Sequence, residues 1–223
     1  MDTKETLRFL SELSLNNNRE WFHENKKTYE VIKADILGFV GNLIVQISAF
    51  DPDIIAINPK DCLFRIYRDV RFSNDKSPYK THIGAFISKG GRKGNHSGYY
   101  IHFEPGQSLV AGGLYMPTPP VLKAVRDEIH FNTDEFQEII NHPEFKKFFA
   151  GLDDDDKLTR PPKGYPADWE HIDLLKYRSY TVSASLPEKL LSEHSFNDYL
   201  LSAFHTMYPF NRFLKRALVN MGG

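Results

Sequence analysis

Apolar residues recur at helical spacing over the first fifty positions of the chain. A capping pair and three leucines open it: Asp2, Glu5, Leu7, Leu10 and Leu13. This pattern predicts a short amphipathic helix. Asn16-Asn17-Asn18 interrupts the pattern, because asparagine side chains compete for backbone hydrogen bonds. A second apolar stripe from Phe22 to Ile47 predicts a longer helix that ends before Asp51-Pro52.

From Cys62 onward the apolar period changes to two. Alternation of this kind predicts half-buried strands. Strands are expected over residues 62–67, 83–88, 99–104, 108–116 and 174–184. The first four follow one another along the chain, which predicts an antiparallel meander sheet of about five strands in all.

Helical spacing returns in the last third of the chain. Helices are expected after Pro117, over 133–141, 143–150 and 187–193, and in two final segments separated by Pro209. Residues 151–170 form the longest loop, which Tyr165 and Trp169 anchor. Helices, then strands, then helices predict a single α+β domain spanning residues 1–223, with the sheet packed by N-terminal and C-terminal helices.

Charge and composition exclude a globally charged surface. The 223 residues carry 28 Lys+Arg against 29 Asp+Glu, a formal net charge of -1. Duplex nucleic acid or an anionic membrane would therefore have to be bound by a local patch.

Cysteine usage and hydropathy indicate a cytoplasmic protein without a membrane span. Cys62 is the only cysteine, which excludes an intramolecular disulfide and a cysteine-based zinc site. The N-terminus lacks a basic-then-apolar secretory pattern, and polar residues and glycines interrupt the longest apolar window, Ile36 to Phe50.

A cationic block follows the first predicted strand. Between Arg65 and Lys80, five Lys and Arg residues face only two aspartates. Guanidinium groups bind phosphate and carboxylate bidentately. The block therefore predicts a cleft for a small phosphorylated or carboxylated ligand in an enzyme or a binding protein. Its candidate ligand-binding residues are Arg65, Tyr67, Arg68, Arg71, Lys76, Tyr79 and Lys80.

Three alternatives remain open for this block. Acids such as Asp69, Asp75, Glu20 or Glu104 can pair with the cations in a structural network. Together with residues 89–93, the block can also form the surface of a nucleic-acid or protein-interaction module, in which the bases of a single strand stack on the tyrosines. Lastly, it can be a folding latch with the function elsewhere. The surplus of cations favours the anionic ligand.

His102 and Glu104 are the candidate catalytic residues. They lie two apart on one predicted strand, and His82 precedes the neighbouring strand. An acid–base pair or a metal site is geometrically feasible there. A polar, solvent-facing sheet surface is the simpler interpretation, so no metal site is assigned.

Other features carry no chemistry in the sequence. Trp21, Asn25 and Tyr29 share a helical stripe typical of core packing, and Cys62 lies on an apolar strand face. Residues 153–156 lack the alternating ligands of a calcium loop. No nucleotide-binding or nucleophile motif is present, so the cofactor and the oligomeric state remain open.

Several blocks of the chain resemble a family of bacterial and fungal proteins known only as a conserved domain of unknown function. These blocks are residues 17–22 with 25, 26 and 29, residues 64–72 with 75–80, and residues 98–102, 112–117, 161–165 and 174–176. The resemblance covers nearly the whole chain. It implies a single intact domain and brings no catalytic residue, cofactor or substrate.

Overall fold

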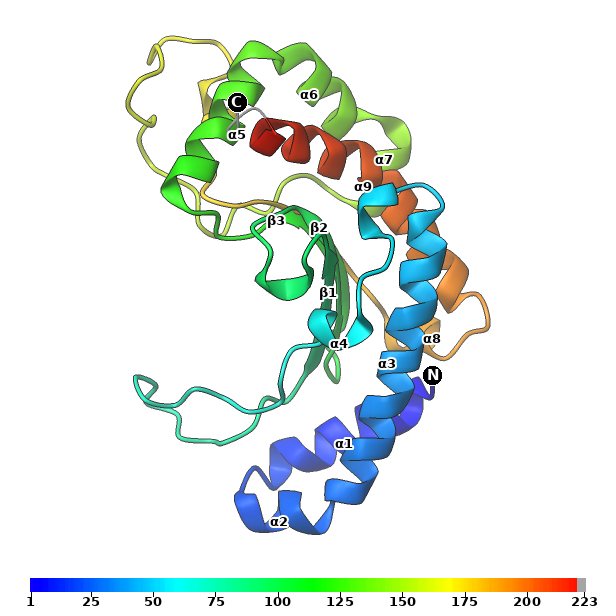
Figure 1. The fold of residues 1–223 in the computed structure, drawn as a ribbon. Helices are drawn as coiled ribbons and strands as arrows, with labels where there is room; N and C mark the ends of the chain where they lie inside the picture. Colours follow the sequence, from blue (N-terminus) through cyan, green and yellow to red (C-terminus); the bar gives the residue numbers. More distant parts are fainter. Residues whose placement is uncertain (220–223) are drawn as a thin grey trace.

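A four-stranded antiparallel sheet occupies the middle of the molecule (Figure 1). The computed structural model describes residues 1–219. The strands are β1 (Ile83–Ser88), β2 (Gly98–Phe103), β3 (Leu109–Leu114) and β4 (Tyr180–Ser185), paired in that order. The α+β class and the antiparallel meander predicted from the sequence are therefore confirmed.

Helices precede, interrupt and follow the strands. The N-terminal ones are α1 (Thr3–Leu15), α2 (Arg19–Glu24), α3 (Lys26–Ser48), η1 (Pro52–Ile54) and α4 (Pro59–Cys62). The short η2 (Gly91–Lys93) lies between β1 and β2. The remainder are α5 (Pro119–Phe131), α6 (Thr133–Asn141), α7 (Pro143–Phe148), η3 (Ile172–Leu175), α8 (Glu188–Leu191) and α9 (Phe196–Val219). The Asp2 side chain caps α1 as expected, because it accepts a 2.9 Å hydrogen bond from the amide of Glu5.

The two faces of the sheet differ in what covers them. Helices α3 and α9 lie along one face, and the opposite face looks onto the concave side of the molecule (Figure 1). Ala85, Ile101 and Val110 form one cross-strand row, and all three are buried toward the helices. The adjacent row, Phe86 and Tyr100, is only half-buried. Alternation along the strands thus separates a core face from an accessible one.

Helix α9 approaches the sheet closely because two glycines in β3 have no side chains. A Cβ on Gly112 would lie 2.4 Å from the carbonyl oxygen of Gly98, and Met207 of α9 packs directly above. Gly113 has a φ of +107°, a conformation that L side chains rarely adopt. Larger residues at either position would push α9 away from the core.

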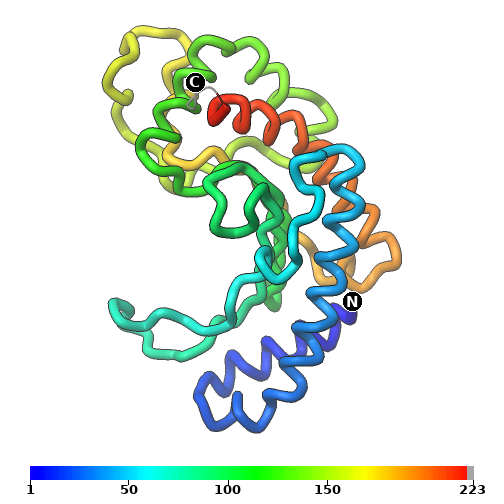
Figure 2. The backbone as a smooth tube through the Cα atoms, viewed as in Figure 1, coloured from blue at the N-terminus to red at the C-terminus, as the bar shows by residue number. Residues whose placement is uncertain are grey.

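The strand expected over residues 62–67 does not form, so the sheet has four strands among the described residues. Cys62 ends α4, and only one isolated bridge, Leu63 with Ala85, joins the segment to β1. The chain then folds back on itself, since Tyr67 bridges Tyr79. Residues 63–82 therefore form an arm that extends from the sheet instead of a fifth strand (Figure 2).

Pro209 does not divide the C-terminal helix, contrary to the expectation of two segments. Helix α9 runs through Pro209 without a break and is 24 residues long in total. Proline removes one hydrogen bond and crowds the carbonyl four residues earlier, which bends a helix without necessarily ending it. Figure 1 shows the two halves of α9 running in different directions, so α9 packs against both the sheet and helices α5 to α7.

Helix α3 is long and apolar enough to cross a bilayer by length and composition alone. Polar residues and glycines interrupt the later apolar window that begins at Ile36. One face of α3, however, is buried in the protein core through Ile36, Val40, Leu43 and Ile47. Helix α3 therefore packs one face on the core, while Val31 and Val45 lie exposed on its other side.

A buried ion pair joins three distant parts of the chain. Asp51, 1% exposed, precedes η1 and accepts hydrogen bonds from Lys215 Nζ of α9 at 2.7 and 2.9 Å. The hydroxyl of Tyr99 in β2 donates to the same carboxylate at 2.8 Å. The three groups satisfy one another inside the core.

Replacing Asp51 with alanine is expected to lower the free energy of unfolding by about 3 kcal/mol, because it leaves the buried ammonium of Lys215 with only the half-exposed carboxylate of Asp53, 3.4 Å away. Urea unfolding followed by circular dichroism measures this loss. Glu5→Ala breaks the exposed Glu5–Arg8 pair and serves as the control, with an expected loss of roughly 1 kcal/mol or less. Equal losses in the two variants would contradict the structural role of Asp51.

Candidate functional site

The accessible face of the sheet forms the floor of a cleft of about 640 Å³. Aromatic side chains line much of it: Phe64, Phe86, Tyr100, Tyr115 and Tyr177. Polar groups also reach it, among them Lys80 and His82 from the end of the arm and Arg178 from the segment before β4. An apolar cleft with a few charged groups is the usual form of a small-molecule site.

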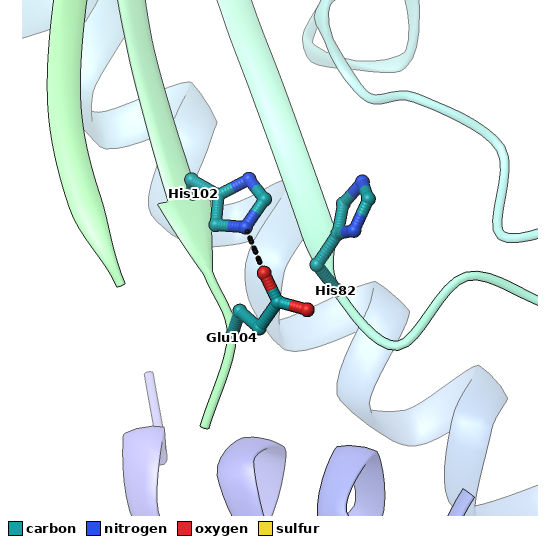
Figure 3. A group of neighbouring side chains, drawn as sticks. All are labelled: His82, His102 and Glu104. Carbon is teal, nitrogen blue, oxygen red and sulfur yellow. Dashed lines mark hydrogen bonds and ion pairs between the residues drawn. The ribbon is translucent and has the colours of Figure 1, made fainter. Parts of the chain in front are cut away.

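A hydrogen-bonded chain of three polar residues runs along β2 at one end of this face. Tyr100 Oη lies 2.8 Å from His102 Nδ1, and His102 Nε2 lies 2.9 Å from Glu104 Oε2 (Figure 3). Thr81 donates to the other carboxylate oxygen at 3.0 Å. Both ring nitrogens of His102 are thus engaged, an arrangement that fixes its orientation.

His82 completes this group from the neighbouring strand. It immediately precedes β1, and its ring centroid lies 4.4 Å from that of His102. One ligand atom from each of His82, His102 and Glu104 lies within 4.8 Å of the others. Figure 3 shows the ring of His102 joined to Glu104, with the ring of His82 lying beside them. The register of β1 and β2 therefore joins the two sequence candidates to His82.

Partial burial changes the proton affinity of these groups. Desolvation, followed by the nearby His102, lowers the pKa of His82 to about 4, so His82 is neutral at pH 7. Burial also raises the pKa of Tyr100 to about 12. Burial alone would raise the pKa of Glu104, but the hydrogen bonds from His102 and Thr81 outweigh it and lower that pKa.

A glycine in β1 makes room for Tyr100. A Cβ on Gly84 would lie 2.4 Å from the Tyr100 hydroxyl oxygen and 2.9 Å from its ring. Gly84 is the cross-strand partner of His102, so the Tyr100 side chain leans over Gly84 to reach the imidazole. This close approach explains a glycine inside a strand.

The tyrosines of the cationic block hold the arm to the helices. Tyr79 is buried and stacks on Phe22 of α2 with ring centroids 4.0 Å apart. Asn17 exchanges two hydrogen bonds with the Tyr79 backbone, at 3.0 and 3.1 Å. Tyr67 is half exposed and lines a separate shallow depression with Arg68. Tyr79 therefore anchors the base of the arm.

Most of the cations in the block already have partners within the arm. Arg68 pairs with Asp75, and Arg71 pairs with Asp69. Lys76 donates to the carbonyl of Val70 at 3.0 Å. Hydrogen bonds from Ser77 and then Arg68 lower the pKa of Asp75, which keeps this acid ionised.

The candidate ligand-binding residues do not meet around one opening. Of the seven, Lys80 alone lines the cleft on the sheet, whereas Tyr67, Arg68 and Tyr79 line the shallow depression. Arg65 is exposed. The structure therefore divides the block into an internally paired arm and one lysine at the cleft.

The helical stripe of Trp21 and Tyr29 and the aspartates of residues 153–156 both make contacts within the protein. Tyr29 is buried against Phe9, and Trp21 packs on the same ring, which confirms the core interpretation of this stripe. Asp153 accepts a 2.7 Å hydrogen bond from Ser183, and Asp156 lies 3.6 Å from Arg178. These aspartates lie along the β4 side of the cleft.

Sequence reasoning missed the supporting residues of the site. Thr81, Gly84 and Tyr100 received no role in the interpretation of the sequence. The glycine inside a predicted strand was the available signal, because it indicates a close approach by a neighbour. The contact with Tyr100 depends on the strand register.

We expect Gly84→Ala to lower the free energy of unfolding by about 1–3 kcal/mol, since the new methyl group forces the Tyr100 ring to move. Gly38→Ala in α3 is the matched control, because nothing lies within 4 Å of a Cβ there. The free energy of unfolding of the Gly38→Ala variant is expected to rise by about 0.5–1 kcal/mol. Urea denaturation measures both, and a neutral Gly84→Ala variant would refute the predicted clash.

Cys62 is expected to be unreactive in the folded protein. The thiol is fully buried, and desolvation raises its pKa from 9.0 to about 11. At pH 8 the thiolate population is then roughly a hundredfold smaller than for an ordinary cysteine. Ellman's reagent should react slowly with native protein and rapidly in urea, whereas rapid reaction of both forms would argue against this environment.

Comparison with known protein families places most of the chain in one of them. The conserved hypothetical protein family DUF2461 matches residues 5–213. No curated protein and no solved structure shows significant similarity. The matched range includes the arm, the sheet and the cleft, and it confirms the resemblance noted in the sequence. The chain belongs to the conserved hypothetical protein family DUF2461.

Proposed function

We propose that this protein binds a small phosphorylated or carboxylated ligand in the cleft on the sheet, with Lys80 as the cation that meets the anion. The observation that carries the proposal is an unpaired ammonium group at a cleft. Lys80 forms no ion pair with any carboxylate of residues 1–219, although it lines the cleft. A partly buried ammonium gains most from an anionic partner.

The surroundings of Lys80 support this assignment. Its Nζ lies 5.4 Å from the centre of the Phe64 ring, so part of its environment is aromatic. Desolvation, and then the positive charge of Arg65, lower the pKa of Lys80. An anion placed against Lys80 would relieve both effects. Arg68 and Arg71 contribute less to the proposal, because each is already neutralised by an aspartate.

We further propose that His102 and Glu104 act as an acid–base pair on a substrate bound in this cleft, which they reach through Tyr100. A ligand held by Lys80 would lie beside His82 and Tyr100, which line the cleft with it. Tyr100 is hydrogen-bonded to His102, and His102 to Glu104. Such a chain supports proton exchange with a bound substrate. We expect the protein to act in the cytoplasm, where its single buried thiol stays reduced.

A thermal-shift panel of inorganic phosphate, nucleotides, sugar phosphates and organic acids tests the proposal. At least one anion should raise the melting temperature of the wild type. Lys80→Met should weaken binding of that anion about tenfold or more, because it removes a charge-assisted contact. Lys76→Met is the matched control, since Lys76 is an exposed lysine of the arm. The affinity of this variant for the anion should match that of the wild type.

The proposal fails if no anion stabilises the protein or if the two lysine variants bind equally. Single-stranded oligonucleotides form a separate arm of the same panel. A salt-dependent shift with oligonucleotides alone would favour the nucleic-acid module.

A further inference from the structure

We infer that His82, His102 and Glu104 form a binding site for a divalent first-row transition metal ion at the edge of the cleft. The three residues come from the entry to β1 and the end of β2, and their ligand atoms lie within 4.8 Å of one another. Figure 3 shows the three side chains around a shared space. Two imidazoles and one carboxylate are a recurrent ligand set for zinc and non-haem iron.

The spacing of the donor atoms suits a single ion. Ligands about 2.1 Å from a metal lie roughly 3.0 Å apart at the right angles of octahedral coordination and roughly 3.4 Å apart at tetrahedral angles. His102 Nε2 and Glu104 Oε2 are separated by 2.9 Å. This separation is that of adjacent octahedral ligands, and tetrahedral coordination would widen it by roughly 0.5 Å. His82 is half-buried, makes its only described ring contact with His102, and offers a ring nitrogen within 4.8 Å of the other two ligand atoms.

Neighbouring residues orient two of the ligands as in established metal sites. The Tyr100 hydroxyl lies at His102 Nδ1, which leaves Nε2 as the nitrogen that faces the carboxylate. Thr81 holds Oε1 of Glu104 and leaves Oε2 toward the imidazole. Metal-binding histidines and carboxylates usually have such outer partners. With metal bound, Nδ1–H would donate to the Tyr100 oxygen, and Nε2 would bind the ion.

The donor types select the class of metal. Two nitrogens and one oxygen favour Zn²⁺, Fe²⁺, Co²⁺ or Mn²⁺ over Ca²⁺ and Mg²⁺, which prefer oxygen ligands. Three protein ligands leave at least one position for water or a ligand oxygen. Because His82 and Tyr100 line the cleft, we expect the free position to face it. The metal inference does not require the proposed anion to bind.

Metal binding to the full-length, chelator-treated protein tests this inference. Isothermal titration with Zn²⁺ and Co²⁺, together with the visible spectrum of the Co²⁺ form, should give one site per chain with nitrogen ligation. His82→Ala and Glu104→Gln should abolish the Co²⁺ spectrum. Tyr100→Phe should keep the site but weaken it about 10–100-fold, because it removes the outer partner of His102. His96→Ala, a cleft histidine outside the cluster, is the control and should bind like the wild type.

Circular dichroism of each variant confirms that it is folded before titration. Absence of a Zn²⁺ and Co²⁺ site in the wild type would overturn the inference, as would unchanged binding in folded His82→Ala. Phosphate and nucleotide binding by the metal-free protein is measured separately. Failure of the metal site and failure of the proposed anion binding are therefore distinguishable.

Discussion

The buried carboxylate of Asp51 is the interaction on which the arrangement of the sheet depends. It binds Lys215 of α9 and Tyr99 of β2 in a region where unpaired charges would cost several kcal/mol. These contacts fix one face of β2 against the helical layer. Because side chains alternate along a strand, Tyr100 and His102 must then point to the opposite face. The core contact therefore determines which residues reach the cleft.

The candidate site forms where strand alternation and strand register combine. Alternation places Tyr100 and His102 on one face, and the register of β1 sets Gly84 beside His102. The missing Cβ at Gly84 lets Tyr100 reach the imidazole, and Thr81 at the end of the arm holds Glu104. Each polar side-chain atom of Tyr100, His102 and Glu104 consequently has a hydrogen-bond partner. These bonds keep the three side chains ordered at a partly buried position.

The arm of residues 63–82 has two different kinds of charge. Near its tip, arginines and aspartates pair locally, so these charges hold the shape of a long segment with little regular structure. At its base, Tyr79 and Asn17 tie the arm to the N-terminal helices. Past this anchor, Lys80, Thr81 and His82 enter the cleft region in succession. The residues up to Tyr79 therefore shape and anchor the arm, and the residues that follow it directly, Lys80 to His82, reach the proposed binding site.

The amino-acid sequence by itself determined the α+β class and nearly all of the helices and strands. Local periodicity was sufficient because each of these elements buries one side, as in α1 and β2. The sequence also singled out His102 and Glu104, since two residues on one strand face need no tertiary information to be neighbours. It could not separate Lys80 from the paired arginines of the same block, because an ion pair depends on how the arm folds back.

Only the tertiary structure decided the failure of the strand at 62–67 and the continuity of α9 through Pro209. In both cases packing overrode the local pattern: the chain near Leu63 makes a single bridge to β1, and contacts on both sides of Pro209 hold one bent helix. Tertiary structure also decided the meeting of His82 with His102 and Glu104, which depends on the pairing of two strands. Long-range pairing is set by the global fold, and no local window of sequence contains it.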